Sequence, residues 1–140
     1  MKDSSSLHLK VQEQCDCFAL NDPLKEMAAI NRDPDPGEAA VKWLALAALH
    51  GINSNAKKIT LIRDKDGATR VVATYRDTEL PTPDAQIGKR IVETVREITH
   101  ITEAKGKTPL ALGIRDSSLN MKVKIKSKGG SDQITLKFPQ

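Results

Sequence analysis

One apolar stretch, residues 39–49, constrains the fold of this chain more than any other feature of the sequence. Only Lys42 interrupts it, so a helix formed there is apolar almost all round and has to be buried on most sides. At this length it cannot cross a bilayer, which takes about 20 apolar residues. We therefore expect this helix to be the core element on which the following residues pack.

The ends of this helix carry residues that commonly begin and end helices. Asp35 can accept hydrogen bonds from the free N–H groups, and Pro36 suits the first helical position. Glu38 lies where a capping-box carboxylate belongs, and Gly51 is the expected left-handed stop. Together these signals predict a helix that starts at Pro36 and stops at Gly51.

Length and composition bound the class of protein. A chain of 140 residues is expected to form one domain that buries about two thirds of its unfolded surface. Aromatic residues are scarce, so the core must be aliphatic. The first residues lack the apolar region of a signal peptide, and no segment is long enough for a membrane helix. We therefore expect a cytoplasmic protein without membrane insertion.

Beyond the first long helix, the sequence predicts two strands, a second helix and three strands. Thr82 is the expected cap of that second helix, and its apolar stripe comprises Ile87, Ile91, Val95 and Ile98. Alternating and β-branched residues predict strands over residues 57–63, 68–75, 110–115, 121–127 and 133–138. Turn residues separate the strands at residues 64–67, 116–118 and 128–130.

The short connections between consecutive strands favour hairpins. The expected fold class is therefore α+β: a largely antiparallel sheet of about five strands with two main helices on one face. Residues 1–34 are expected to form an N-terminal extension, either docked on the domain at residues 35–140 or partly disordered. Within it, residues 7–11 alternate between apolar and polar, which predicts a short strand. An Asn-Asp-Pro sequence then opens a short helix over residues 24–30.

Charge is distributed unevenly along the chain. The net charge is +4, but residues 105–140 carry +6 and the rest of the chain carries −2. Lys122, Lys124 and Lys126 alternate with apolar residues, so these lysines share one face of a strand. Either that face is solvated and guards an edge against aggregation, or it binds phosphates of a nucleic acid, a nucleotide or a lipid. No aromatic residue lies among the lysines to stack on bases.

Gly106, Lys107 and Thr108 look like the end of a phosphate-binding loop. The full motif needs a glycine where Ile101 stands, and it needs a helix after the loop, whereas a strand is expected here. We therefore expect a plain turn and no phosphate-binding loop.

Cys15, Cys17 and His8 could supply soft ligands for zinc, because cysteines at this spacing on a strand point to the same face. Zinc sites usually combine two Cys-x-x-Cys pairs, so we favour the alternative of a half-buried, reduced cysteine pair.

His50 and His100 each close a helix, where a cation favours the helix dipole. No nucleophile–base arrangement or acid pair can be assembled. We therefore expect no enzyme, no cofactor and no metal.

Several short sequence motifs between residues 38 and 138 are similar to those of a known module. An apolar helix ending in Gly51 leads into a strand. The segment from Tyr75 through Arg76 to Leu80 is similar to a Tyr-Arg-x-Asp-Gly turn. In the closing strands, basic residues alternate with apolar ones. In these features the chain resembles the PAS-like domain that precedes the motor domain in type II secretion and type IV pilus assembly ATPases. Arginines of that family approach the nucleotide held by the motor domain. This chain has lysines there, which lack the bidentate fork of arginine.

The resemblance implies a non-catalytic regulatory or assembly module that binds a protein partner, such as a component of a secretion or pilus machine. The alternative from the charge pattern is a basic domain that binds anions or nucleic acid through its C-terminal strands. Either function would use the same candidate residues: Arg76, Lys107, Lys122, Lys124, Lys126, Lys128 and Lys137.

Overall fold

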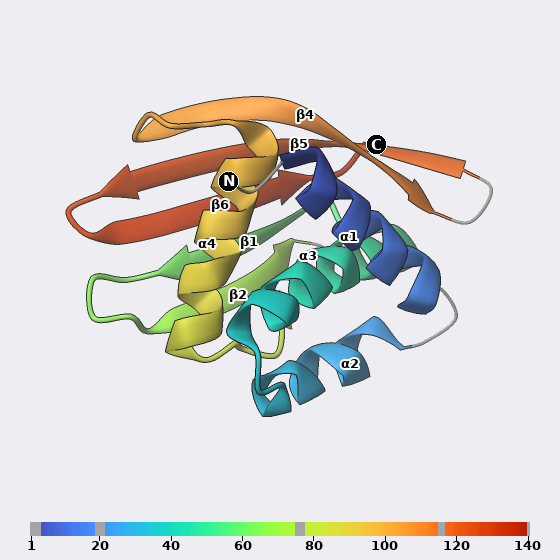
Figure 1. Cartoon of the computed structure of the whole chain (residues 1–140), viewed down its shortest axis with the longest axis horizontal. Coiled ribbons are helices and arrows are strands. Elements are labelled where there is room, and N and C mark those ends of the chain that lie inside the picture. Colours follow the sequence, from blue (N-terminus) through green and yellow to red (C-terminus); the bar gives the residue numbers. More distant parts are fainter. Residues whose placement is uncertain (1–3, 19–21, 75–77, 115–116, 140) are drawn as a thin grey trace.

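The computed structural model describes residues 4–18, 22–74, 78–114 and 117–139, and Figure 1 shows their arrangement. One antiparallel sheet forms a layer, and the described helices lie together on one of its faces. The elements follow in the order α1 (Ser4–Phe18), α2 (Pro23–Ala29), a 3-10 helix (Ile30–Arg32), α3 (Pro36–Asn53), β1 (Lys58–Arg63), β2 (Thr69–Thr74), β3 (Thr78–Glu79), α4 (Ala85–Thr99), β4 (Lys105–Ile114), β5 (Ser117–Lys128) and β6 (Ser131–Lys137).

The sheet has the strand order β3-β2-β1-β6-β5-β4, and every neighbouring pair is antiparallel. Since β3 has only two residues, five longer strands make up most of the sheet. The predicted α+β class, with a largely antiparallel sheet and helices on one face, is confirmed. The last strand of the chain, β6, lies at the centre of the sheet between β1 and β5.

The apolar helix predicted from the sequence is α3, and it forms the centre of the helical layer. Every residue from Ala39 to Gly51 except Lys42 is buried. Helices α1, α2 and α4 all pack against it. Lys42 remains half-exposed because its ammonium group reaches the carboxylate of Asp33 at 3.1 Å. None of the described helices is long and apolar enough to span a membrane.

The start of α3 is capped as predicted, with one difference. Pro36 occupies the first turn, and Oδ1 of Asp35 accepts a hydrogen bond from the Gly37 N–H at 2.9 Å. Glu38 was expected to complete a capping box, but the Asp35 N–H donates instead to Asp33 at 3.0 Å. A neighbouring aspartate therefore satisfies the donor that the glutamate would have taken.

The expectation that Gly51 stops α3 is wrong. The helix continues to Asn53, and the left-handed residue beyond it is Asn55, with φ of 53°. A Cβ at Gly51 would overlap the aromatic ring of Phe138. The glycine is therefore explained by close packing of the helix against the C-terminal segment, which the sequence of the helix alone does not reveal.

The second predicted helix is α4, although its cap is Asp84 rather than Thr82. Oδ1 of Asp84 accepts a hydrogen bond from the Ile87 N–H at 3.0 Å. The predicted apolar stripe is buried as expected: Ile87, Ile91, Val95 and Ile98. The helix ends at Thr99, and the next residue, His100, has a φ of 60°, which lies in the left-handed region.

The strand expected at residues 7–11 is wrong, because these residues belong to helix α1. Val11 and Cys15 lie one helical turn apart and are buried in the same core cluster as α3. The short alternation around residue 9 does not mark a sheet face, since Leu9 is 56% exposed. The short helix expected after Pro23 is present as α2, with Asp22 as its cap.

The 3-10 helix connects the N-terminal region of the chain to the loop before α4 through hydrogen bonds. The side chain of Asn31 donates to the Thr82 carbonyl at 3.0 Å, and its oxygen accepts from the Asp84 N–H at 2.8 Å. Together with the burial of Val11, these bonds place residues of the expected N-terminal extension against the rest of the fold.

Two tight turns set the register of the central strands. Gly67 has φ of 90° in the predicted Asp-Gly turn between β1 and β2. Gly129 and Gly130 have φ of 59° and 84° between β5 and β6, which is the requirement of a two-residue type I′ turn. Strands β4 and β5 are longer than the predicted strands, and of the turn expected at residues 116–118 the last two residues belong to β5. Residue 116 lies outside the described residues.

Candidate anion-binding site

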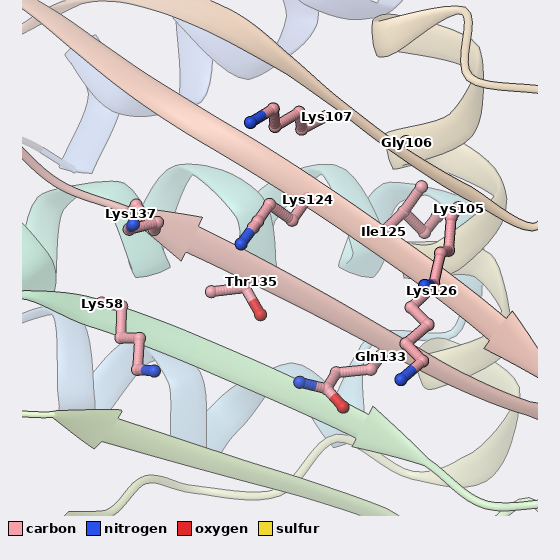
Figure 2. A pocket seen from close by; sticks show the side chains of 10 residues that line it. All are labelled: Lys58, Lys105, Gly106, Lys107, Lys124, Ile125, Lys126, Gln133, Thr135 and Lys137. Carbon is pink, nitrogen blue, oxygen red and sulfur yellow. The ribbon is translucent and has the colours of Figure 1, made fainter.

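The face of the sheet opposite the helices is lined with exposed lysines. In β5, Val123 and Ile125 are buried against the helices, whereas Lys122, Lys124 and Lys126 are exposed. This is the consequence of the two-residue period of a strand. The prediction that these three lysines share one face is confirmed, and Figure 2 shows that face with the helices behind the sheet.

Antiparallel register places further lysines beside those of β5. Across the β4–β5 pair, Lys105 lies opposite Lys126 and Lys107 lies opposite Lys124. Lys137 of β6 lies opposite Lys122, and on its other side it lies opposite Lys58 of β1. Four neighbouring strands therefore contribute lysines to a single surface, although Lys58 is far from the others in the sequence.

These side chains surround an open concavity of about 530 Å³. Six of the lining residues are lysines, and none of the described lining residues is acidic or aromatic. Figure 2 shows the ten lining residues on their strands: Lys58, Lys105, Gly106, Lys107, Lys124, Ile125, Lys126, Gln133, Thr135 and Lys137. We call these six lysines and the hollow between them the lysine face.

No carboxylate of the described residues forms an ion pair with the lysine face. The ion pairs found among the described residues lie elsewhere: Lys10–Glu38, Lys42–Asp33, Arg63–Asp132 and Arg90–Glu93. Like charges directly opposite one another on paired strands are destabilising. The face therefore concentrates positive potential at some cost to the stability of the fold.

A polar cluster on the opposite side of the sheet fixes one end of the strands that carry these lysines. The guanidinium of Arg96 on α4 donates to the Ser127 hydroxyl at 2.7 Å and to the Glu103 carbonyl at 2.8 Å. The Ser127 hydroxyl in turn donates to Asp132 at 2.5 Å, which pairs with Arg63 at 3.4 Å. These contacts join the start of β4 and the β5–β6 hairpin to α4, so the lysine face has a fixed support.

The structure brings together most of the candidate residues predicted from the sequence. Lys107, Lys124, Lys126 and Lys137 line the concavity. Lys122 lies on the same face opposite Lys137 but outside the lining. Lys128 lies at the end of β5, exposed and also outside the lining. Arg76 lies outside the described residues, so its prediction stays open.

Two lining lysines, Lys58 and Lys105, were not among the predicted site residues. Lys58 precedes the buried Ile59 in β1. The alternation of exposed and buried residues in this strand indicates that Lys58 faces away from the core. Lys105 was missed because β4 starts earlier than predicted. The plain turn expected at Gly106 is wrong for the same reason, since this glycine lies within β4. A Cβ there would approach Ile101 to 2.7 Å.

The explanation of the lysines as guards of a sheet edge does not fit β5, which lies between β4 and β6. The edge strand beside β5 is β4. Its outer side carries Pro109, which lacks an N–H group, and Nε2 of His8 donates to the Ala111 carbonyl at 2.7 Å. Proline and a covering helix are common protections of an edge, so the edge has its own protection and the lysines of β5 need another explanation.

The arrangement of Cys15, Cys17 and His8 does not form a metal site. Residues two apart on a helix point in nearly opposite directions, and Cys15 is buried while Cys17 is exposed. Burial raises the pKa of the Cys15 thiol to about 12. His8 is engaged with β4, and among the described residues no group of three potential ligands comes together. The expected half-buried pair is therefore one buried and one exposed cysteine.

The surroundings of His50 disfavour the cation expected at the end of α3. Its side chain is buried, and burial lowers the pKa of the imidazole, although the charge of Asp22 opposes this effect. Nδ1 of the ring lies 3.2 Å from the Ser54 hydroxyl. A neutral imidazole gives little interaction with the helix dipole.

Comparison with known proteins finds no family model that matches this chain and no matching curated protein. The similarity to the pre-motor domain of secretion and pilus ATPases therefore remains a prediction from short sequence phrases. The lysine face is the feature from which a function can be argued.

Proposed function

We propose that this chain is a non-catalytic binding module that holds a phosphate-rich polyanion on its lysine face. The observation that carries the proposal is the convergence of six lysines from four strands around one concavity without a described carboxylate. Lysine is a compact point charge that suits phosphate groups without fixing their orientation. Such a face attracts and holds a multiply charged anion through summed electrostatic contacts.

The pattern of charges supports this proposal over a merely solvated surface. Solubility is served as well by interspersed charges of both signs, whereas here like charges face each other across paired strands. Opposed like charges destabilise a sheet. A bound polyanion would remove the repulsion between the opposed lysines. This gives a physical reason why the fold keeps an arrangement that lowers its stability.

The proposal is tested by calorimetric titration of the purified chain with inorganic polyphosphate at 50 and 200 mM salt. The double variant Lys124→Gln/Lys126→Gln removes two lining charges. The control Lys25→Gln/Lys89→Gln removes two exposed lysines from α2 and α4, on the other side of the sheet. We expect the first variant to bind at least about tenfold more weakly at 50 mM salt, and the control to bind within about twofold of the original chain.

Equal losses in both variants would contradict the proposal, because they would indicate attraction by net charge alone. A failure of polyphosphate to bind at 50 mM salt would contradict it as well. Melting curves of both variants confirm that each remains folded under the titration conditions.

A second candidate function is supported by the order of elements. From α3 to β6 the chain runs helix, two strands, helix and three strands, apart from the two-residue β3, and this is the order on which the resemblance to the pre-motor domain of secretion and pilus ATPases depends. In this proposal the chain is a regulatory or assembly module, and Lys124, Lys126 and Lys137 approach a nucleotide held by a protein partner.

The second candidate is tested by affinity capture from native lysate, with the captured proteins identified by mass spectrometry. Capture of a secretion or pilus ATPase by the original chain, lost in Lys124→Gln/Lys126→Gln, supports it. Capture of no such component contradicts it. Under either proposal the purified chain hydrolyses no ATP, and steady turnover that followed the protein through every column would contradict both.

A further inference from the structure

We infer that the polyanion is a nucleic-acid duplex, which the lysine face holds by its phosphate backbone without reading the base sequence. This inference rests on the proposed function and names the class of ligand. It depends on three properties of the face: its extent, its lack of stacking groups and its breadth, which keeps its side chains out of the major groove.

The lysine face is broad enough to contact several phosphates at once. From Lys107 on β4 to Lys58 on β1 there are three strand spacings, or about 14 Å. In the other direction, Lys137 lies level with residue 122 of β5, which is four residues from Lys126 along the strand, or about 13 Å. Each strand of a duplex carries one phosphate per about 3.4 Å of its axis, so about four phosphates of one strand span the face. A single nucleotide would leave most of the lysines uncompensated.

A single-stranded ligand would gain little beyond its charge from this surface. Proteins that bind single strands stack bases on aromatic side chains in a basic groove. No described residue lining the concavity is aromatic, and the aromatic side chains of Trp43 and Phe138 are buried in the core. Without stacking, the ligand with the higher charge density has the advantage, and a duplex carries one charge per about 1.7 Å of its axis.

The lining also offers few groups that could distinguish base pairs. Base readout uses arginine, lysine, asparagine or glutamine side chains that enter the major groove, which is about 12 Å wide and admits a helix or a two-stranded ribbon. The described lining holds no arginine or asparagine and one glutamine, Gln133, and its lysines stand on four neighbouring strands, a surface too broad to enter that groove. The lysines therefore remain at the phosphates, and such contacts carry no sequence information. We therefore expect binding that is strong at low salt and nearly independent of sequence.

The charge count predicts the size of the salt dependence. If all six lysines of the face contact phosphates, log K for a DNA duplex falls against log salt with a slope of about −5. Between 50 and 200 mM salt this corresponds to a loss of about 10³ in affinity. Removal of Lys124 and Lys126 should make the slope shallower by about 2.

The test uses fluorescence anisotropy with four labelled probes of 20 nucleotides or base pairs: two DNA duplexes of unrelated sequence, an RNA duplex and one DNA single strand. Each is titrated with the original chain, with Lys124→Gln/Lys126→Gln and with the control Lys25→Gln/Lys89→Gln. We expect at least one class of duplex to bind about fivefold or more tightly than the single strand at equal salt. The two DNA sequences should bind within about twofold of each other, and the control should keep the original slope.

The outcomes separate this inference from the proposed function. Single strands that bind as tightly as duplexes, a strong preference for one DNA sequence, or duplexes that fail to bind while polyphosphate binds would overturn the inference and leave the proposed function standing. Binding to anionic lipid vesicles without binding to duplexes would likewise overturn it. Failure of polyphosphate and all nucleic acids to bind would overturn both.

Discussion

Lys137 provides the sharpest test of the cost that the lysine face imposes on the fold. It lies in the central strand β6 and faces Lys122 on one side and Lys58 on the other. Lys137→Gln should therefore relieve two repulsions at once while it removes one phosphate contact. We expect the variant to be more stable than the original chain and to bind polyphosphate more weakly.

The magnitude follows from Coulomb's law. Two ammonium groups about 7 Å apart in water repel by about 0.6 kcal/mol before screening. Because the Debye length is about 30 Å at 0.01 M salt, about 8 Å at 0.15 M and about 3 Å at 1 M, two such pairs give about 1, 0.5 and 0.1 kcal/mol respectively. At 0.15 M salt the gain corresponds to a rise of about 2 °C in the melting temperature.

The assay is urea unfolding of the variant and the original chain at these three salt concentrations. Lys128→Gln is the control, because it removes the same charge from β5 at a position opposite Ser131, and it should change stability little. A variant at Lys137 that is less stable than the original chain, or a gain that does not shrink with salt, would refute the reasoning.

Three further predictions concern the core and its titratable groups. Gly51→Ala should destabilise the fold by about 1–3 kcal/mol in urea unfolding, against the usual gain from alanine in a helix, because its Cβ overlaps Phe138; a gain in stability would contradict this packing. Burial lowers the pKa of His50, so the unfolded chain takes up a proton first and stability falls as the pH drops below about 6.5. His50→Gln should lose less stability between pH 7.5 and 5.5, and an unchanged loss would be contrary evidence. A thiol reagent should modify Cys17 rapidly and Cys15 only on unfolding, and equal rates would contradict the burial.

The strands and the two main helices could be predicted because their signals are local. A two-residue period such as that around Val123 fixes which side chains face the core, and Asp-Gly or Gly-Gly between strands marks a hairpin. The N-terminal helix was missed because five alternating residues around Leu9 looked like a strand. The helical spacing of Val11 and Cys15 becomes meaningful only once α3 is known to lie against them.

The lysine face was only partly predictable for a related reason. The alternation of β5 shows that Lys124 and Lys126 share a face, and this holds for any register. The addition of Lys58 depends on the placement of β6 between β1 and β5, and the addition of Lys105 depends on the start of β4, which comes earlier than the sequence pattern indicates. The prediction that Gly51 ends the helix failed for the same reason. This glycine packs against Phe138, which is far away in the sequence.

The claim that the open sheet face binds a polyanion is tested most directly by an NMR titration of the ¹⁵N-labelled chain with inorganic polyphosphate at 50 mM salt. We predict that the amide shifts that move are those of β1, β4, β5 and β6 around the lysine face, while the amides of α2 and the exposed side of α4 stay in place. Shifts concentrated on the helices, or no shifts at saturating polyphosphate, would contradict it.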